Sequence, residues 1–348
     1  MDRSHPFSKS IEILRVIGTL LVVLLHSQQD NLRLDGSLNS IVQISLSSVI
    51  CTVAVPLFFF ISGYLFSEGF SVDKSFSDNF SVYKRKIKSR FKSLVIPYFL
   101  WNVLVLIAFS VMFYFIKKEP IDFFLKEQGV YGVLWSYHGF PIDYSLWFVR
   151  DLIVLSLLYP IIIFIVKFTG EVGLMTLLIL LLSTIKIPVD GLNTTSLFFF
   201  FWGSFMNMKY AWKGKINSNL LKGLIIISFL LSVVSVALFN NEIIRRPIIK
   251  IFDIISILIL LSSFTYLYEK NAYLRTVNYS PMTFFIIAFH PIIIFCVKHL
   301  LDNYFQSFNS LLGYFFVFII SFALSYASYF ILGTLFPKSM RLLTGGRK

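Results

Sequence analysis

Long apolar runs separated by short polar segments dominate the hydropathy pattern of the chain. Ten runs are visible, at residues 11–27, 41–66, 94–116, 145–166, 172–187, 194–208, 221–239, 248–268, 280–299 and 311–336. A helix needs about 20 mostly apolar residues to cross a bilayer. Because backbone polar groups in lipid must be satisfied within the segment, continuously apolar runs favour helices. The pattern predicts an all-α polytopic bundle of about ten transmembrane helices, forming a single domain over residues 1–348.

Composition and cysteine usage agree with a membrane protein. Only 14% of the 348 residues are charged, whereas soluble domains average about 25%. The first run contains Glu12 and Arg15 and lacks a small-residue cleavage pattern, so we expect it to be retained rather than removed as a signal peptide. Cys51 and Cys296 lie inside apolar runs, without the spacing of a disulfide framework or a metal site. We therefore expect packed thiols and no metal.

The distribution of lysine and arginine predicts the orientation of the chain. If the N-terminus is cytoplasmic, the inside segments hold 20 of the 31 lysines and arginines, and the outside segments hold nine. Cytoplasmic loops carry such an excess, so both termini are expected in the cytoplasm. The net charge of +13 then sets topology and suits an anionic lipid leaflet. Nucleic acid is not expected as a partner, because the apolar runs leave room for no soluble basic domain.

Ionisable residues inside the apolar runs are candidates for chemistry, because each costs about 2.5–3.5 kcal/mol on insertion scales. They are Glu12, Arg15, His26, Arg150, Asp151, Asp253 and His290. Arg15 and His26 are eleven residues apart, which places them within about 20° of one helix face and about 16 Å apart along the axis. Glu12 precedes Arg15 by three residues and is expected to pair with it. The spacing alone equally allows an Arg15 that reaches the lipid interface and a His26 at the span boundary.

Four motifs occur in order along the chain. They are Arg15 and His26 with ten residues between them, Val-Pro-Leu-Phe-Phe-Phe-Ile-Ser-Gly at 55–63, Leu-Trp-Phe at 146–148, and His290-Pro291. Together they resemble the acyltransferase-3 family of integral membrane acyltransferases, of the bacterial O-acetyltransferase type, over residues 11–300. The resemblance implies transfer of an acetyl group from cytoplasmic acetyl-CoA, without a metal, to a hydroxyl group of a cell-surface or lipid-linked glycan at the inner membrane.

Roles for individual residues follow from this resemblance. His26 is the expected general base for the attacking hydroxyl group, since histidine suits proton transfer near neutral pH. Arg15 is expected to assist catalysis or to position the substrate. Arg85, Lys88 and Arg90 in the basic segment 67–93 are expected to bind the phosphates of CoA. The family commonly has two residues between two arginines here, whereas this chain has four, and a basic segment is also what topology alone requires.

Arg150, Asp151 and His290 are expected to support the site or bind substrate. The alternative for Arg150 and Asp151 is a structural ion pair with a neighbouring helix. Pro291 removes one backbone hydrogen bond from its helix and frees a carbonyl group, which a polar side chain or water is expected to satisfy. Family members often have a tyrosine shortly before this histidine, and this chain has none there. For Asp253, an interhelical hydrogen bond and a place in a polar cavity both remain open.

Two other functions compete with this interpretation. A polysaccharide or solute exporter would also have about ten helices with charges near the membrane midplane, but no repeated halves are visible. An unrelated membrane-bound O-acyltransferase would instead depend on His290. Loss of acyl transfer on substituting His26 supports the acyltransferase-3 interpretation. Loss only on substituting His290 supports the unrelated membrane-bound O-acyltransferase.

Overall fold

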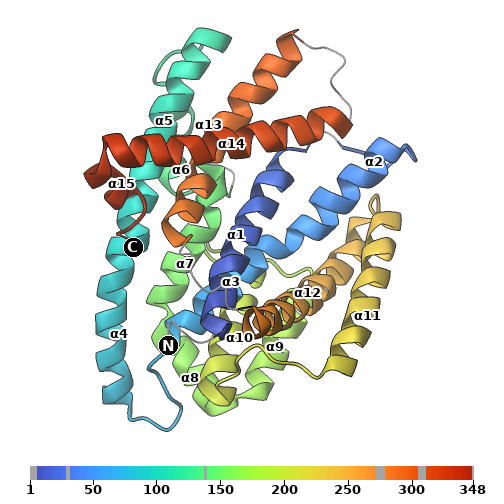
Figure 1. Ribbon diagram of the computed structural model, residues 1–348. Coiled ribbons are helices and arrows are strands. Elements are labelled where there is room, and N and C mark those ends of the chain that lie inside the picture. The colour runs from blue at the N-terminus through green and yellow to red at the C-terminus, as the bar shows by residue number, and fades with distance from the viewer. Residues whose placement is uncertain (1–5, 29–31, 137–138, 272–278, 305–310, 347–348) are drawn as a thin grey trace.

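The structure is a computed structural model that describes residues 6–28, 32–136, 139–271, 279–304 and 311–346. The described chain folds mainly into helices that surround a central α1 (Figure 1). They are α1 (Pro6–His26), α2 (Leu38–Gln43), α3 (Ala54–Phe66), α4 (Phe76–Arg90), α5 (Ile96–Lys117), α6 (Phe123–Leu134), α7 (Trp147–Leu157), α8 (Tyr159–Thr169), α9 (Glu171–Leu182), α10 (Thr194–Tyr210), α11 (Ser218–Ala237), α12 (Glu242–Lys270), α13 (Ser280–Tyr304), α14 (Leu311–Leu335) and α15 (Pro337–Leu343).

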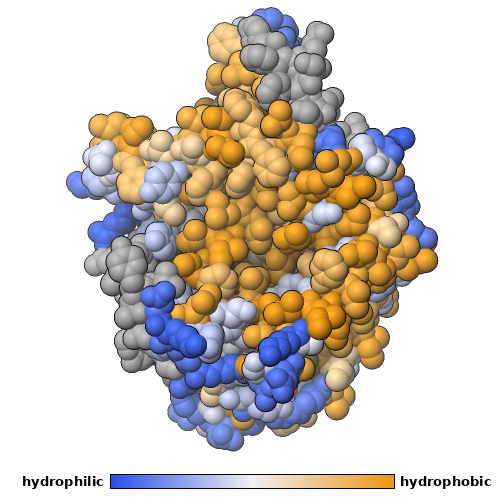
Figure 2. Space-filling view, turned by 45° about the vertical axis from the view of Figure 1, so that its right-hand side comes forward, coloured by the Kyte–Doolittle hydropathy of each residue, from blue (hydrophilic) through white to orange (hydrophobic). Residues whose placement is uncertain are grey.

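Six of the described helices have the length and apolarity to cross a membrane. They are Leu38–Phe66, Ser77–Lys117, Ser218–Ala237, Glu242–Lys270, Pro281–Asn303 and Leu311–Leu335. A broad apolar surface covers much of the face seen in Figure 2, with hydrophilic side chains gathered along its lower edge. The predicted class, an all-α multi-pass membrane protein, is confirmed. The count of about ten spans and the cytoplasmic position of both termini stay predictions.

The segment predicted as one helix over residues 145–166 is bent by 65° between α7 and α8. Pro160 lies in the first turn of α8 and cannot donate to the ladder of α7, so the helix ends at Leu157 and restarts at Tyr159. If α7 and α8 together count as one broken span, the described chain has up to seven. The apolar run predicted at 145–166 is thus divided into two helices, because the proline interrupts the hydrogen-bond ladder.

The basic segment predicted as a loop over residues 67–93 is largely helical. Ser75 caps α4 by accepting a 3.1 Å hydrogen bond from the Asp78 backbone N–H. The helix then continues through a π turn, Phe91–Val95, into α5. Pro97 follows that turn and lacks a backbone N–H, so the wider hydrogen-bond spacing accommodates it without ending the helix. One helix therefore joins the basic segment to an apolar span.

Helices α3 and α10 cross at two glycines and form the tightest contact of the core. A methyl group on Gly63 would lie 2.0 Å from the Phe200 carbonyl oxygen, and one on Gly203 would lie 2.0 Å from that of Phe60. Only glycine permits this approach. The Ser204 hydroxyl also donates to the Gly63 carbonyl at 3.0 Å. α3 in turn packs on α1, so this crossing fixes one wall of the space beside α1.

Candidate functional site

The cytoplasmic half of α1, in the proposed orientation, reaches a cavity that also contains Arg90. We call it the arginine cavity; its volume is about 270 Å³, and Arg15, Ser62, Arg90, Ser93 and Thr283 form its polar wall. Among the described residues that line it, none carries a carboxylate. Two guanidinium groups facing one cavity make it attractive to an anion, because each can donate to phosphate or carboxylate oxygens in a forked geometry.

Arg90 reaches this cavity because α4 presents one face to α3. Its guanidinium lies 5.1 Å from the centre of the Phe66 ring, and the Lys86 ammonium donates a 3.0 Å hydrogen bond to the Leu65 carbonyl. Arg85 and Lys88 lie on the exposed side of α4. The structure thus joins Arg90 to Arg15, and it does not bring Arg85 or Lys88 into the lining of the cavity.

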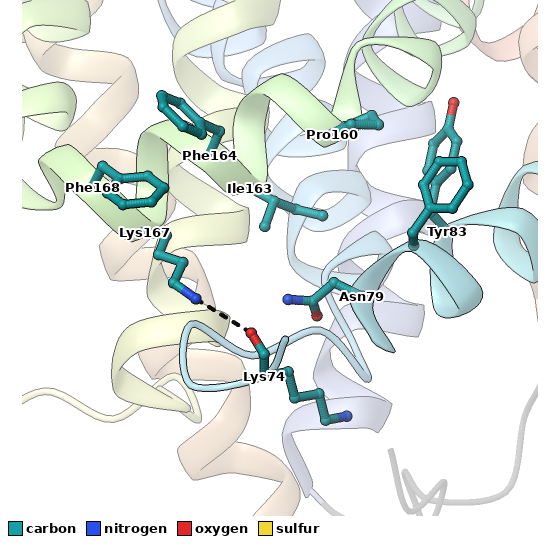
Figure 3. A pocket seen from close by; sticks show the side chains of 9 residues that line it. Lys74, Asn79, Tyr83, Pro160, Ile163, Phe164, Lys167 and Phe168 are labelled. Atoms are coloured by element: carbon teal, nitrogen blue, oxygen red, sulfur yellow. Dashed lines mark hydrogen bonds between the residues drawn. The ribbon is translucent and has the colours of Figure 1, made fainter. Parts of the chain in front are cut away.

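The bent pair α7 and α8 holds α4 in this orientation (Figure 3). The Tyr83 hydroxyl donates a 3.1 Å hydrogen bond to the Leu157 carbonyl, at the break between the two helices. The Lys167 ammonium donates at 3.3 Å to the backbone carbonyl of Lys74, just before α4 begins. A largely apolar groove of about 260 Å³ lies between these two contacts. The break at Leu158 therefore serves to seat the basic helix.

The other end of α1 brings His26 to a larger space. We call it the histidine cavity; its volume is about 570 Å³, and its lining includes His26, Gln28, Tyr144 and Lys298. The Tyr144 ring meets the His26 imidazole edge to face, with centroids 5.0 Å apart. The Lys298 ammonium donates a 2.7 Å hydrogen bond to the Gln28 carbonyl, which ties α13 to the end of α1. His26 is thus a half-buried imidazole beside a cation and a phenol ring.

His290 lies against His26, with ring centroids 5.4 Å apart. Its Nδ1 is 2.7 Å from the carbonyl oxygen of Ile287, the group that Pro291 leaves without a helical partner. The Ser145 hydroxyl donates to the same carbonyl at 2.7 Å. The expected satisfaction of a carbonyl freed by Pro291 is therefore confirmed. A carbonyl only accepts, so Nδ1 carries the hydrogen, and the buried Nε2 has no hydrogen-bond partner among the described residues.

A thin partition separates the two cavities. On α13, Ile287 lines the arginine cavity and Ile294 lines the histidine cavity, with His290 between them. Tyr144 and Phe148, four residues apart, likewise line the histidine and the arginine cavity. About one turn of α13 on each side of His290, and the short segment that leads into α7, therefore lie between the two spaces. The imidazole of His290 stands in this partition, against that of His26.

Arg150 and Asp151 form a buried ion pair at 3.2 Å. The Arg150 guanidinium also donates to the Trp135 carbonyl at 2.8 Å, and the Asp151 carboxylate accepts from the Asn193 side chain at 2.6 Å. These bonds join α7 to the segment after α6 and to the cap of α10, and neither residue lines the two cavities. Glu12 makes an ion pair with Lys9 at 3.4 Å.

Two residues beside His26 were missed by sequence reasoning. Tyr144 precedes the Leu-Trp-Phe motif, and Lys298 was counted only as an outside charge. A positively charged residue eight positions after His290, on the same apolar helix, was the one signal that pointed to Lys298. Nothing in the sequence marks Tyr144, because it meets His26 through the tertiary packing of the segment before α7.

The geometry supports acid–base chemistry at one cavity and anion binding at the other. A family model described as an acyltransferase domain matches residues 8–330, nearly the whole chain. No curated protein and no solved structure matches the chain.

Proposed function

Because the chain belongs to the acyltransferase-3 family and is a membrane acyltransferase, we propose that it transfers an acetyl group from acetyl-CoA to a hydroxyl group of a cell-surface or lipid-linked glycan. The observation that carries this proposal is the partition at His290. A donor in the arginine cavity and an acceptor in the histidine cavity would meet across this partition. We place the enzyme in the inner membrane, with the arginine cavity towards the cytoplasm.

The arginine cavity suits the donor. CoA carries several phosphate charges, and Arg90 lies where the basic helix α4 enters the bundle. Arg15 lies on α1, on the face that also carries His26, so a donor held at Arg15 has its acyl end directed along that face. The hydroxyl groups of Ser62, Ser93 and Thr283 line the way and suit the amide groups of the pantetheine arm. Since Arg15 is about 16 Å from His26 along the helix, its role is to hold the donor.

His26 takes the hydroxyl proton as the acceptor oxygen attacks the thioester carbonyl. A C–O bond forms, and the tetrahedral intermediate carries its negative charge on the former carbonyl oxygen. The Lys298 ammonium, which lines the same cavity, faces this oxyanion. The intermediate then expels the CoA thiolate, and the imidazolium of His26 returns the proton to sulfur. His290, fixed by the Ile287 carbonyl, keeps the His26 ring in position.

The test is acetyl-CoA consumption by purified protein in lipid nanodiscs, measured as released CoA thiol in the presence and absence of glycan acceptors. His26→Ala should lower turnover by about 10²- to 10⁴-fold, the usual contribution of a general base. His299→Ala is the matched control, because His299 lies in the same helix as His290 and its ring is bonded by Asn303 rather than by the partition. Equal turnover by wild type and His26→Ala would refute the mechanism, and no CoA chemistry at all would favour an exporter.

A further inference from the structure

A third cavity opens beside the His26 end of α1. We call it the polar cavity; its volume is about 330 Å³, and its lining includes Gln28, Ser48, Thr52, Arg245, Arg246 and Lys250. We propose that the polar cavity binds an anionic group of the acceptor, a carboxylate or phosphate, and so presents a neighbouring hydroxyl group to His26. This inference rests on the proposed acyl transfer and adds the chemical class of the acceptor.

One wall of the polar cavity departs from regular α-helix, and the facing helix contains a proline. Within the span Leu38–Phe66, a π turn at Ile44–Val49 is followed by a 3₁₀ turn at Ile50–Val53. On the facing side, Pro247 lies inside α12. Irregular backbone within a membrane is tolerated where it lines a cavity, and π turns occur frequently at functional sites. The π and 3₁₀ turns, which contribute Ser48 and Thr52 to the lining, therefore mark the polar cavity as a built site.

The charges of the polar cavity leave one cation for a ligand. Arg245 is held by protein groups: it pairs with Glu242 at 2.8 Å and donates to the Ser48 carbonyl at 2.5 Å. The Lys250 ammonium lies 3.8 Å from the buried carboxylate of Asp253. Arg246 is exposed, and among the described residues it has no hydrogen bond or ion pair. With three cations against two carboxylates, the site favours an oxyanion, which Arg246 can bind through two N–H groups.

Topology does not account for these cations. In the proposed orientation, Arg245, Arg246 and Lys250 lie on the outer side, where the positive-inside bias disfavours arginine and lysine. All three also fall inside the span Glu242–Lys270, where charge is costly. Because these cations are found despite both trends, we infer that a bound anion offsets the free-energy cost of placing them there.

Gln28 connects the polar cavity to the catalytic histidine. It lines both the polar and the histidine cavity, and Lys298 fixes its backbone carbonyl at 2.7 Å. Leu25, the neighbour of His26 in the chain, also lines the polar cavity. An anion bound at Arg246 would thus be separated by Gln28 from the histidine cavity. The acceptor would then be held at two points: its anionic group in the polar cavity and its reacting hydroxyl group in the histidine cavity.

The first test measures binding without turnover. Ser48→Cys, in a background with Cys51→Ala and Cys296→Ala, places one thiol in the polar cavity, where the Ser48 hydroxyl makes no hydrogen bond among described residues. In neutral phosphatidylcholine nanodiscs, methyl glucuronoside and glucose 1-phosphate should slow alkylation of this thiol, and methyl glucoside should not. Adding Arg246→Gln should weaken protection about tenfold, the scale of one charge-assisted hydrogen bond. Arg33→Gln, an exposed charge outside the polar cavity, should leave it unchanged.

Other outcomes separate the explanations. Equal protection by the neutral and the anionic sugars would overturn the proposal. Protection only when the nanodiscs contain phosphatidylglycerol would make the polar cavity a lipid headgroup site and would overturn it as well. Anion protection combined with absent CoA chemistry would refute the proposed acyl transfer while leaving the anion site standing. Acyl transfer lost in His26→Ala but without anion protection would refute only the present inference.

Discussion

The two ends of α1 bear different chemistry on one helix. At Arg15 the wall is cationic and hydroxyl-rich, and the second arginine comes from a helix anchored outside the apolar core. At His26 the neighbours are rings: Tyr144 at 5.0 Å and His290 at 5.4 Å, with Lys298 close by. The first end can recognise charge, but none of the described residues that line it has a group suited to take a proton near neutral pH. The second end has that group in a protected setting.

In the proposed mechanism this difference separates binding from chemistry. If the arginine cavity binds the donor equally in the ground state and the transition state, losing its interactions should raise KM. If the interactions at the histidine cavity change as the proton moves, losing them should lower kcat. Substitutions at the two ends are expected to give opposite kinetic signatures.

The largest effect after that of His26 is expected at His290. His290→Asn retains a side-chain N–H for the carbonyl that Pro291 frees but removes the ring beside His26. We expect kcat to fall on the order of 10- to 100-fold, the scale of a misplaced reacting group, with KM for acetyl-CoA unchanged. Steady-state kinetics in nanodiscs provide the measurement. An unchanged kcat together with normal thermal stability would show that His290 does not position His26.

A smaller effect, on KM for acetyl-CoA rather than on kcat, is expected at Arg90. Arg90→Gln removes one of the two guanidiniums that line the arginine cavity and leaves the partition intact. KM for acetyl-CoA should rise about tenfold, as for the loss of one charge-assisted hydrogen bond, while kcat changes little. Lys92→Gln provides the control, since Lys92 lies in the same segment but does not line the arginine cavity. A fall in kcat alone would break the distinction between the two ends.

The smallest effect is expected for the double substitution of Arg85→Gln and Lys88→Gln. Both side chains are exposed on α4, so their field at the arginine cavity is screened by salt. KM for acetyl-CoA should rise by about twofold or less at 0.15 M salt and more at low salt. The titration of KM against ionic strength measures this. A tenfold rise in KM at 0.15 M salt would instead show that Arg85 and Lys88 contact the CoA phosphates directly, as the family resemblance implied.

Much of the frame could be predicted from the sequence because it depends on local periodicity. Apolar runs predicted an all-α membrane protein, and the eleven-residue spacing predicted that Arg15 and His26 share one face of α1. Pro291 predicted a freed carbonyl by its chemistry alone, and the His290 ring and the Ser145 hydroxyl satisfy that carbonyl. Each of these inferences required only one helix.

The rest of the site could not be predicted, because it depends on how each helix is rotated about its axis relative to its neighbours. Arg90 lies about 140° from Arg85 and about 160° from Lys88 around a helix, so a helix that turns Arg90 towards the arginine cavity turns the other two away from it. From the sequence, residues 67–93 are interpreted as a loop, in which side chains have no fixed direction, and the same role is therefore predicted for all three residues. Tyr144 reaches His26 through packing between segments distant in sequence, which no local pattern records.

The helix that runs unbroken from Ser77 to Lys117 touches both cavities. Arg90 near its start lines the arginine cavity, and Phe109 and Phe113 further along line the histidine cavity. A helix resists compression along its axis, so this rod holds the two cavities at a set spacing. The π turn Phe91–Val95, where the hydrogen-bond register is altered, lies between Arg90 and these two phenylalanine rings, so we expect any bending of this helix to be concentrated there.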